Sequence, residues 1–211
     1  QLCRLIEAGH FVYPHIHPHW LNAEYLQENH IWNLSDISKY RFHSLSEKQK
    51  SELFNDSFKT LSDLLLKQYP GVKIDAFRAG GWCIQPFEDF KPFFESNGIV
   101  ADFSVLSGAK KNTNSLLFDF SSIAPDALPY RFSNDPCKPE LNGQFEEFPI
   151  SGVEVNPSGK IAYLINAILY RIKYGKSMGD GNGVVVKNKA NLPDENQQTE
   201  MASIELMLWN N

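Results

Sequence analysis

Residues 9–20 read Gly9-His10-Phe11-Val12-Tyr13-Pro14-His15-Ile16-His17-Pro18-His19-Trp20. Four of the six histidines of the chain lie in this stretch, and the other two are His30 and His43. Neutral imidazole is the commonest protein ligand of divalent transition metals, so the stretch is a candidate metal site. A structural or fortuitous histidine cluster is the alternative, although alternating histidines beside a tryptophan are hard to explain as packing.

The spacing of these histidines favours a strand followed by a tight turn. His15 and His17 would share one face of a strand, whereas His15 and His19 would share one face of a helical turn. Pro18 removes a backbone donor and disfavours the α region at His17. We therefore expect a strand that runs to about His15 and a turn that carries residues 17–20.

Helices and strands alternate along the rest of the chain. The longest helix is expected to begin at a capping box, Ser44-Leu45-Ser46-Glu47, and to end at Tyr69-Pro70-Gly71. The other expected helices cover residues 2–8, 87–94 (with a break or kink at Pro92), about 159–174 and 199–209. The expected strands cover residues 72–77, 99–105, 116–120 and 147–150, whereas residues 21–43 and most of 107–146 look irregular.

This alternation favours a βα architecture, in which the chemistry lies at the carboxyl ends of the strands. His15 and Arg78 both occupy such positions. The length of 211 residues fits one domain with a sizeable core.

Composition excludes several classes of partner. The net charge is −5 without a basic cluster, which argues against nucleic acid and anionic membranes. No apolar run reaches the roughly 20 residues of a membrane span. Cys3, Cys83 and Cys137 are odd in number and far apart, so we expect no disulfide framework and favour a reducing, cytoplasmic location.

The histidine spacing resembles the second motif of the polysaccharide deacetylases, the NodB-homology family or carbohydrate esterase family four. That motif reads Gly-His, four residues, then His-Ser/Thr-x-x-His, and Gly9-His10, His15 and His19 fall on it. Ile16 replaces the usual Ser/Thr, which is more similar to a divergent bacterial branch resembling a lipopolysaccharide O-antigen biosynthesis deacetylase. The resemblance implies His15 and His19 as ligands of a divalent metal, most often zinc. It assigns no ligand role to His17, which would support the ligands or lie at the surface.

Residues 77–82, Phe77-Arg78-Ala79-Gly80-Gly81-Trp82, resemble the third motif of the same family. There the arginine pairs with the carboxylate base, and the aromatic residue lines the substrate groove. Gly80 stands where the family usually has proline, and the aromatic comes one residue late. The resemblance implies a catalytic role for Arg78 and sugar stacking by Trp82 and Trp20. A surface arginine beside a turn is the alternative for Arg78.

Two later segments also resemble strands of this family. Residues 97–105 look like its Gly-x-x-x-Asp-x-Ser strand, and residues 146–151 look like its Glu-Phe/Leu-Pro-Ile/Val-Ser strand. The resemblance makes Asp102 a substrate-binding candidate and Glu147 a candidate for supporting the site. Solvated or structural carboxylates at strand ends are the alternative.

The resemblance implies a distorted (β/α) TIM-like barrel and a metal-dependent hydrolase that removes N-acetyl groups from a carbohydrate. The first motif of the family supplies the base and the third metal ligand, and the fifth supplies an acid histidine. Neither is found in residues 1–211. We therefore expect a single deacetylase-like domain over residues 1–211 that lacks the first and last barrel strands, and that is inactive if those motifs are required.

Two other functions remain open. Amidohydrolases and related metal-dependent phosphoesterases carry His-x-His on their first strand, as His15-Ile16-His17 does, but need further His and Asp ligands on later strands. A non-catalytic carbohydrate-binding homologue would use Trp20, Trp32 and Trp82 as stacking platforms. A metal-binding assay separates this last function from both enzymes.

Overall fold

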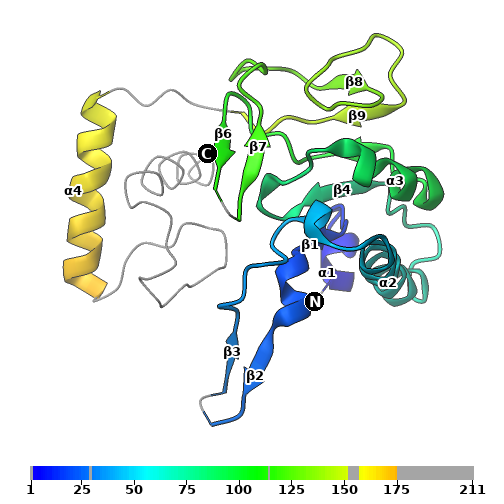
Figure 1. Ribbon diagram of the computed structural model, residues 1–211, viewed down its shortest axis with the longest axis horizontal. Helices are drawn as coiled ribbons and strands as arrows, with labels where there is room; N and C mark the ends of the chain where they lie inside the picture. The colour runs from blue at the N-terminus through cyan, green and yellow to red at the C-terminus, as the bar shows by residue number, and fades with distance from the viewer. Residues whose placement is uncertain (1, 29, 114, 152–156, 175–211) are drawn as a thin grey trace. The chain divides into compact units, whose positions relative to one another are not determined.

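The computed structural model describes residues 2–28, 30–113, 115–151 and 157–174 (Figure 1). The chain divides into two compact units, Gln1–Ser151 and Gly152–Asn211. The expectation of a single domain over residues 1–211 stays a prediction. All site candidates named above lie in the first unit.

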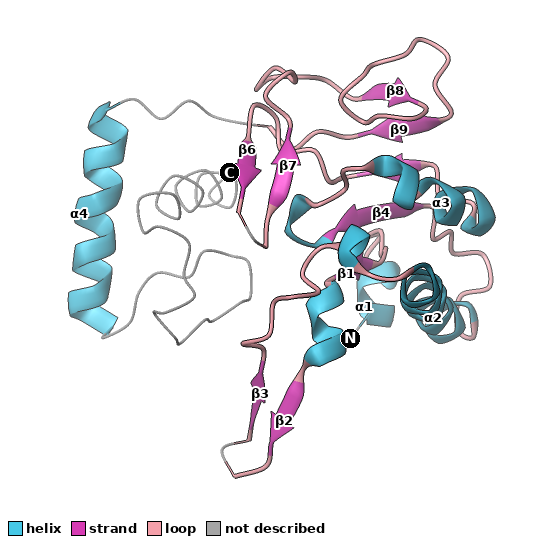
Figure 2. Cartoon of the chain, in the orientation of Figure 1, coloured by secondary structure: helices cyan, strands magenta, loops and turns pink. Residues whose placement is uncertain are grey.

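A five-stranded sheet forms the centre of the first unit (Figure 2). Its order is β1 (His15–Ile16), β4 (Ala76–Ala79), β5 (Ala101–Asp102), β9 (Phe145–Glu147) and β8 (Tyr130–Phe132). The first four strands run parallel, and β8 is antiparallel to β9. Among the described residues the fold is α/β, and its sheet mixes parallel and antiparallel strands and has edges at β1 and β8. The TIM-like barrel therefore stays a prediction.

Phenylalanine rings join two helices to this sheet. Phe54 on α2 (Glu47–Leu66), Phe77 on β4 and Phe94 on α3 (Lys91–Asn97) are fully buried. The ring of Phe77 lies 5.2 Å from that of Phe54 and 5.5 Å from that of Phe94. Each such burial contributes roughly 1.5–3 kcal/mol. These contacts fix β4, and therefore the turn that follows it, against the helices. A further short helix, α1 (Leu2–Glu7), precedes the histidine stretch.

The predicted capping box of α2 is wrong by two residues. Ser46 is the N-cap, and its side chain accepts from the backbone N–H of Gln49, whose own side chain accepts from the N–H of Ser46. Ser44 instead ends the 3-10 helix η2 (Phe42–Ser44) and donates to the carbonyl of Arg41 at 2.6 Å. The helix ends at Leu66, shortly before the predicted stop.

The helix near Pro92 also differs from the prediction. A 3-10 turn, η4 (Phe87–Asp89), is followed by α3, and Pro92 lies in the first turn of α3. Proline is tolerated there because its missing N–H would have no helical partner. Pro92 therefore begins a helix where a break was expected. Gly98 ends α3 with φ 68°, as its predicted C-cap role requires.

Regions that look irregular in the sequence contain β2 (Glu24–Leu26), β3 (Ile31–Asn33), β6 (Lys110–Asn112) and the edge strand β8, whereas β7 (Leu117–Asp119) confirms the strand predicted over residues 116–120. Two hairpins pair β2 with β3 and β6 with β7. Each strand has three residues, which is too short to give a clear alternation of apolar and polar positions.

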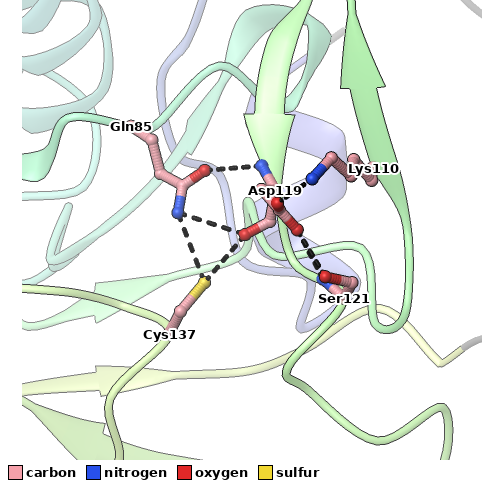
Figure 3. Close-up of polar contacts among 5 residues, drawn as sticks. All are labelled: Gln85, Lys110, Asp119, Ser121 and Cys137. Carbon is pink, nitrogen blue, oxygen red and sulfur yellow. Dashed lines mark hydrogen bonds and ion pairs between the residues drawn. The ribbon is translucent and has the colours of Figure 1, made fainter.

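Polar contacts at Asp119 hold the β6–β7 hairpin to the loop before η4 (Figure 3). The Gln85 side chain accepts from the backbone N–H of Asp119 at 2.7 Å and donates to its carbonyl at 3.3 Å. The Asp119 carboxylate pairs with Lys110 across the hairpin at 2.5 Å and accepts from the Ser121 hydroxyl. The Cys137 thiol also points at the Asp119 carbonyl, at 3.6 Å.

The second unit contributes helix α4 (Pro157–Tyr174), which matches the predicted amphipathic helix. The helix predicted over residues 199–209 lies outside the described residues. None of the helices that the structure describes combines the length and apolarity needed to cross a membrane.

Candidate functional site

The histidine stretch lies at the edge of the sheet, beside the end of β4. His15 on β1 is in register with Arg78 on β4. The Nδ1 of His15 lies 3.0 Å from the Arg78 carbonyl oxygen. A carbonyl only accepts, so Nδ1 carries the proton, and the Nε2 of neutral His15 presents a lone pair. Metal-binding histidines commonly donate their other ring N–H to a carbonyl in this way.

His17 approaches that lone pair most closely. Its Nε2 lies 2.9 Å from the Nε2 of His15, and the two rings are nearly perpendicular at 87°. Two nitrogens that bind one metal at about 2.05 Å with a right angle between them are separated by about 2.9 Å. Without a metal, the Nε2–H of His17 donates to Nε2 of His15, because the proton of His15 is on Nδ1. The geometry accommodates either state.

Gly80 allows this approach, because the turn after β4 passes directly beside His17. A Cβ at Gly80 would lie 2.4 Å from the carbonyl oxygen of Ile16 and 2.9 Å from the Nδ1 of His17. No other residue fits at position 80 without moving β1. This packing therefore requires glycine at position 80, where the deacetylase motif usually has proline.

His19 is the most buried of the three histidines, with no exposed side-chain surface. It lies in the 3-10 helix η1 (Pro18–Asn22), and its ring stacks on Tyr40 at 4.7 Å and 10°. Neither ring nitrogen has a hydrogen-bond partner among the described residues. The resemblance pairs His15 with His19, whereas the structure brings His17 closest to His15. The ligand pair His15 and His19 therefore stays a prediction.

The surroundings lower the pKa of all three histidines. Desolvation, followed by the charges of His15, His19 and Arg78, lowers the pKa of His17 to about 4. Desolvation also lowers the pKa of His15, although its side chain retains some exposure and its bond to the Arg78 carbonyl opposes the shift. Burial alone lowers the pKa of His19. The three rings are neutral near pH 7, which is the form that binds metals.

The turn after β4 places Arg78 over Trp82. The guanidinium carbon of Arg78 lies 5.8 Å from the centre of the indole ring, in cation–π range. Gly81 and Trp82 both have positive φ, 59° and 57°. Trp82 is 2% exposed, so its predicted stacking on a sugar stays a prediction and would need this turn to move.

Buried polar atoms without hydrogen-bond partners concentrate at this site. Within the described residues they include His17 Nδ1, both ring nitrogens of His19, Arg78 Nε and Trp82 Nε1. Leaving one such group unpaired costs about 1–3 kcal/mol, so native structures rarely do so. In native structures ordered water or a ligand commonly pairs with such groups.

The ligand set for a metal is incomplete in the part of the chain that the structure describes. No group of three or more His, Cys, Asp or Glu side chains there is placed to hold a metal ion. Catalytic zinc sites usually have three protein ligands. If a metal bound here, Nε2 of His15 and Nε2 of His17 would supply two of those ligands.

Asp102 and Glu147 lie side by side on β5 and β9, and both are fully buried. Desolvation by burial raises the pKa of Asp102 to about 6, and the hydrogen bonds that Asp102 makes with Glu147 and Ser104 oppose this shift. Desolvation and the neighbouring Asp102 raise the pKa of Glu147 well above its usual value. No N–H or O–H group donates to Oε2 of Glu147, yet the Glu147 side chain is hydrogen-bonded to the Asp102 carboxylate. Two carboxyl groups form such a bond only when one of them carries a proton, so a protonated Glu147 donates to Asp102.

A chain of hydrogen bonds connects this acid pair to the turn after β4. The N–H of Ala79 donates to the Ser104 hydroxyl at 2.8 Å, and that hydroxyl donates to Asp102 at 2.7 Å. The N–H of Val105 donates to Glu147 at 3.1 Å. These hydrogen bonds hold the backbone of Ala79 in place, and Ala79 directly follows Arg78. Contact between Asp102 and substrate stays a prediction, because no surface of Asp102 is exposed.

Two residues of this region were given no role in the site from the sequence. Ser104 follows Asp102 by two positions, which is the spacing at which strand residues share a face. The sequence could therefore have predicted that Ser104 lies beside Asp102. Tyr40 contacts His19, and a Cβ at Gly81 would lie 2.6 Å from its ring. No local pattern marks Tyr40, because the fold alone brings it to the histidines.

A hollow of about 500 Å³ opens beside the histidines, within the usual range for small-molecule sites. His15, His17 and Trp20 line it together with apolar side chains that include Leu2 and Leu53. A larger hollow of about 630 Å³ lies at the β6–β7 hairpin but contains none of the predicted site residues. The smaller hollow is therefore the candidate substrate site.

No family model matches this sequence, and neither a curated protein nor a solved structure was found to be similar to it.

Proposed function

We propose that the histidine site binds a divalent transition metal, zinc, and that the protein hydrolyses N-acetyl groups of a carbohydrate. The proposed metal site rests on the distance of 2.9 Å between Nε2 of His15 and Nε2 of His17. Both ring nitrogens of His19 and Nε of Arg78 also lack a hydrogen-bond partner among the described residues. The carbohydrate and the reaction rest on the motif resemblance and on the exposed Trp20 in the same hollow.

The described residues would divide the work of this reaction. His15 is oriented by its bond to the Arg78 carbonyl and His17 is packed against Gly80, so both rings are held in place before a metal arrives, and His17 would release its Nε2 proton on binding it. A bound divalent metal polarises a carbonyl oxygen and acidifies water. The Arg78 guanidinium has a free Nε and orients a carboxylate or the acyl oxygen. The hollow excludes part of the solvent.

Metal binding is the first test. Titration of the chelator-treated protein with zinc, followed by calorimetry, should give one site. His15→Ala and His17→Ala should each weaken binding at least tenfold, because each removes one of two converging ligands. His10→Ala is the matched control, since His10 is exposed and should leave binding unchanged. Unchanged zinc affinity in both variants would overturn the metal site.

The reaction is tested by acetate release from N-acetylated oligosaccharides in the presence of zinc. Arg78→Lys should reduce turnover more than zinc affinity, because lysine keeps the charge but loses the bidentate geometry. Equal loss of both, or acetate release that survives removal of the metal, would contradict the proposal.

A second function is favoured by the same short contact. His15 and His17 form the His-x-His pair of amidohydrolases and related phosphoesterases, and they are closer to each other than the resemblance to deacetylases requires. His19→Ala decides between the two. Loss of zinc in His19→Ala supports the deacetylase ligand pair, and retention of zinc with loss in His17→Ala supports the His-x-His class.

A further inference from the structure

One peptide group of β4 is held by hydrogen bonds on both of its sides. Its carbonyl, which belongs to Arg78, accepts from Nδ1 of His15 at 3.0 Å. Its N–H, which belongs to Ala79, donates to the Ser104 hydroxyl at 2.8 Å. The C=O and N–H of a planar trans peptide point in opposite directions, and β4 lies between β1 and β5. This one group therefore connects His15 on β1 with the chain that follows β5.

The hydrogen-bond acceptor on the Ser104 side differs from that of a regular parallel sheet. A strand N–H in a parallel ladder normally donates to a backbone carbonyl of the neighbouring strand. A carbonyl can only accept, whereas a hydroxyl accepts and also donates. The Ser104 hydroxyl donates in turn to Oδ1 of Asp102 at 2.7 Å, so the hydrogen bonds continue beyond Ser104.

All donors of this hydrogen-bond chain point toward the Asp102 carboxylate. The ring N–H of His15, the N–H of Ala79 and the hydroxyl of Ser104 donate one after another in the same direction. Protonated Glu147 donates to Asp102 from the other side. The side chains of Ser104, Asp102 and Glu147 have no exposed surface. Hydrogen bonds that follow one another away from water strengthen each other, so the whole chain is held by a buried carboxylate.

The contact between His15 and His17 cannot by itself decide which of the two rings donates. Their Nε2 atoms lie 2.9 Å apart, and the proton between them could belong to either ring. The Arg78 carbonyl removes this ambiguity, because it pairs only with a protonated Nδ1 of His15. The side chain of His15 retains exposure, so water competes for the same N–H. A carbonyl held in place is therefore needed to keep the lone pair of His15 Nε2 facing His17.

We propose that Ser104, held by Asp102, is a positioning residue of the histidine site. It fixes the peptide group between Arg78 and Ala79, whose carbonyl keeps the proton of His15 on Nδ1 and leaves Nε2 free to bind a metal. The metal in this inference rests on the proposed function, whereas the tautomer of His15 does not. Removing a group that orients a ligand histidine commonly weakens metal binding by roughly 10–100-fold.

NMR of the histidine ring nitrogens in the metal-free full chain tests the tautomer directly. Near pH 7 the wild type should show a single form of His15, with a proton on Nδ1 and none on Nε2. Ser104→Ala should give a mixture of both tautomers, because the Arg78 carbonyl is no longer held. Ser104→Thr keeps the hydroxyl and should restore the single form.

Zinc titration by calorimetry is the second measurement. Ser104→Ala should weaken zinc binding about tenfold, and Ser104→Thr should recover most of that loss. Ser107→Ala is the matched control, because it removes a buried serine hydroxyl that has no hydrogen-bond partner among the described residues. It should change neither the tautomer of His15 nor the zinc affinity.

Ser104→Cys keeps the test decisive if Ser104→Ala fails to fold. Cysteine has nearly the same shape and is well tolerated in cores, but its thiol is a weak donor and a weak acceptor. This variant should also give a mixture of tautomers, with a smaller loss of zinc affinity.

A single His15 tautomer and unchanged zinc affinity in both variants would overturn the positioning role, even if the variants unfold more easily, and would leave the proposed metal site intact. A wild type that binds no zinc would instead refute the proposed function. The tautomers of the metal-free protein would then still decide the role of Ser104, with a mixture in Ser104→Ala supporting it and a single form overturning it.

Discussion

Replacing Glu147 with glutamine should change how the stability of the protein depends on pH. Glu147 is buried beside Asp102, and its pKa is raised well above the ordinary value near 4.5. In the native state it therefore retains its proton at pH values at which the unfolded chain has lost it. Stability falls with rising pH wherever the native state binds more protons.

The magnitude follows from the single proton. While native Glu147 is protonated and unfolded Glu147 is ionised, the free energy of unfolding decreases by about 1.4 kcal/mol for each pH unit. Glutamine has nearly the same shape, does not titrate and still donates to Asp102. The stability of Glu147→Gln relative to the wild type should therefore increase by about 1.4 kcal/mol for each pH unit above 5 over which native Glu147 keeps its proton.

Asp102 contributes the same slope to both proteins. Its pKa is raised from 3.8 to about 6, so its part of the stability is present below pH 4 and is lost as the pH rises to 6. Above pH 6 the stability of Glu147→Gln should level off, whereas the wild type should keep losing stability through Glu147 until native Glu147 gives up its proton. The difference between the two curves therefore isolates Glu147.

Urea unfolding followed by circular dichroism at pH 5, 6, 7 and 8 measures this difference. Glu146→Gln makes the same chemical change at the adjacent, exposed position and should follow the wild-type curve. Parallel curves for Glu147→Gln and the wild type would mean that native Glu147 is ionised and that the shared proton is absent.

Three further substitutions test the packing around the site. Gly80→Ala should destabilise the protein by about 1–3 kcal/mol and weaken zinc binding, because the new Cβ would lie 2.4 Å from the Ile16 carbonyl oxygen. Thermal unfolding measures the first effect and zinc titration the second. Ser104→Ala should cost about 1–3 kcal/mol in urea unfolding because it leaves the buried N–H of Ala79 unpaired, whereas Ser104→Thr should recover part of that loss. Phe54→Ala should cost about 3–5 kcal/mol by the same assay, and an unchanged midpoint would contradict its place in the core.

Local sequence rules located several elements because the determining contacts are local. Pro18 and the histidine spacing predicted a strand at His15 followed by a turn, and the structure has β1 and then η1. Gly98 predicted the end of α3, since a left-handed C-cap depends on one residue. The position of Arg78 after a buried strand also predicted its place beside His15.

Other features depended on tertiary contacts. Ser44 and Ser46 are both acceptable helix caps, and the choice follows from Phe42, whose ring stacks on Phe90 at 4.4 Å and holds the preceding turn in η2. The fold likewise decides that His17, and not His19, meets His15 most closely, because Gly80 admits the His17 ring. The sequence spacing alone left both pairs possible.

The order of the sheet also governs how the chain can assemble during synthesis. Strands β1, β4, β5 and β9 are neighbours in the same order in which they leave the ribosome, so each can dock on an edge that already exists. Strand β8 breaks this order, since it precedes β9 in the chain and, among the described strands, pairs with β9 alone. Tyr130–Phe132 must therefore wait, unpaired, until Phe145–Glu147 has emerged, and only then can the carboxyl pair of Asp102 and Glu147 be closed off from water.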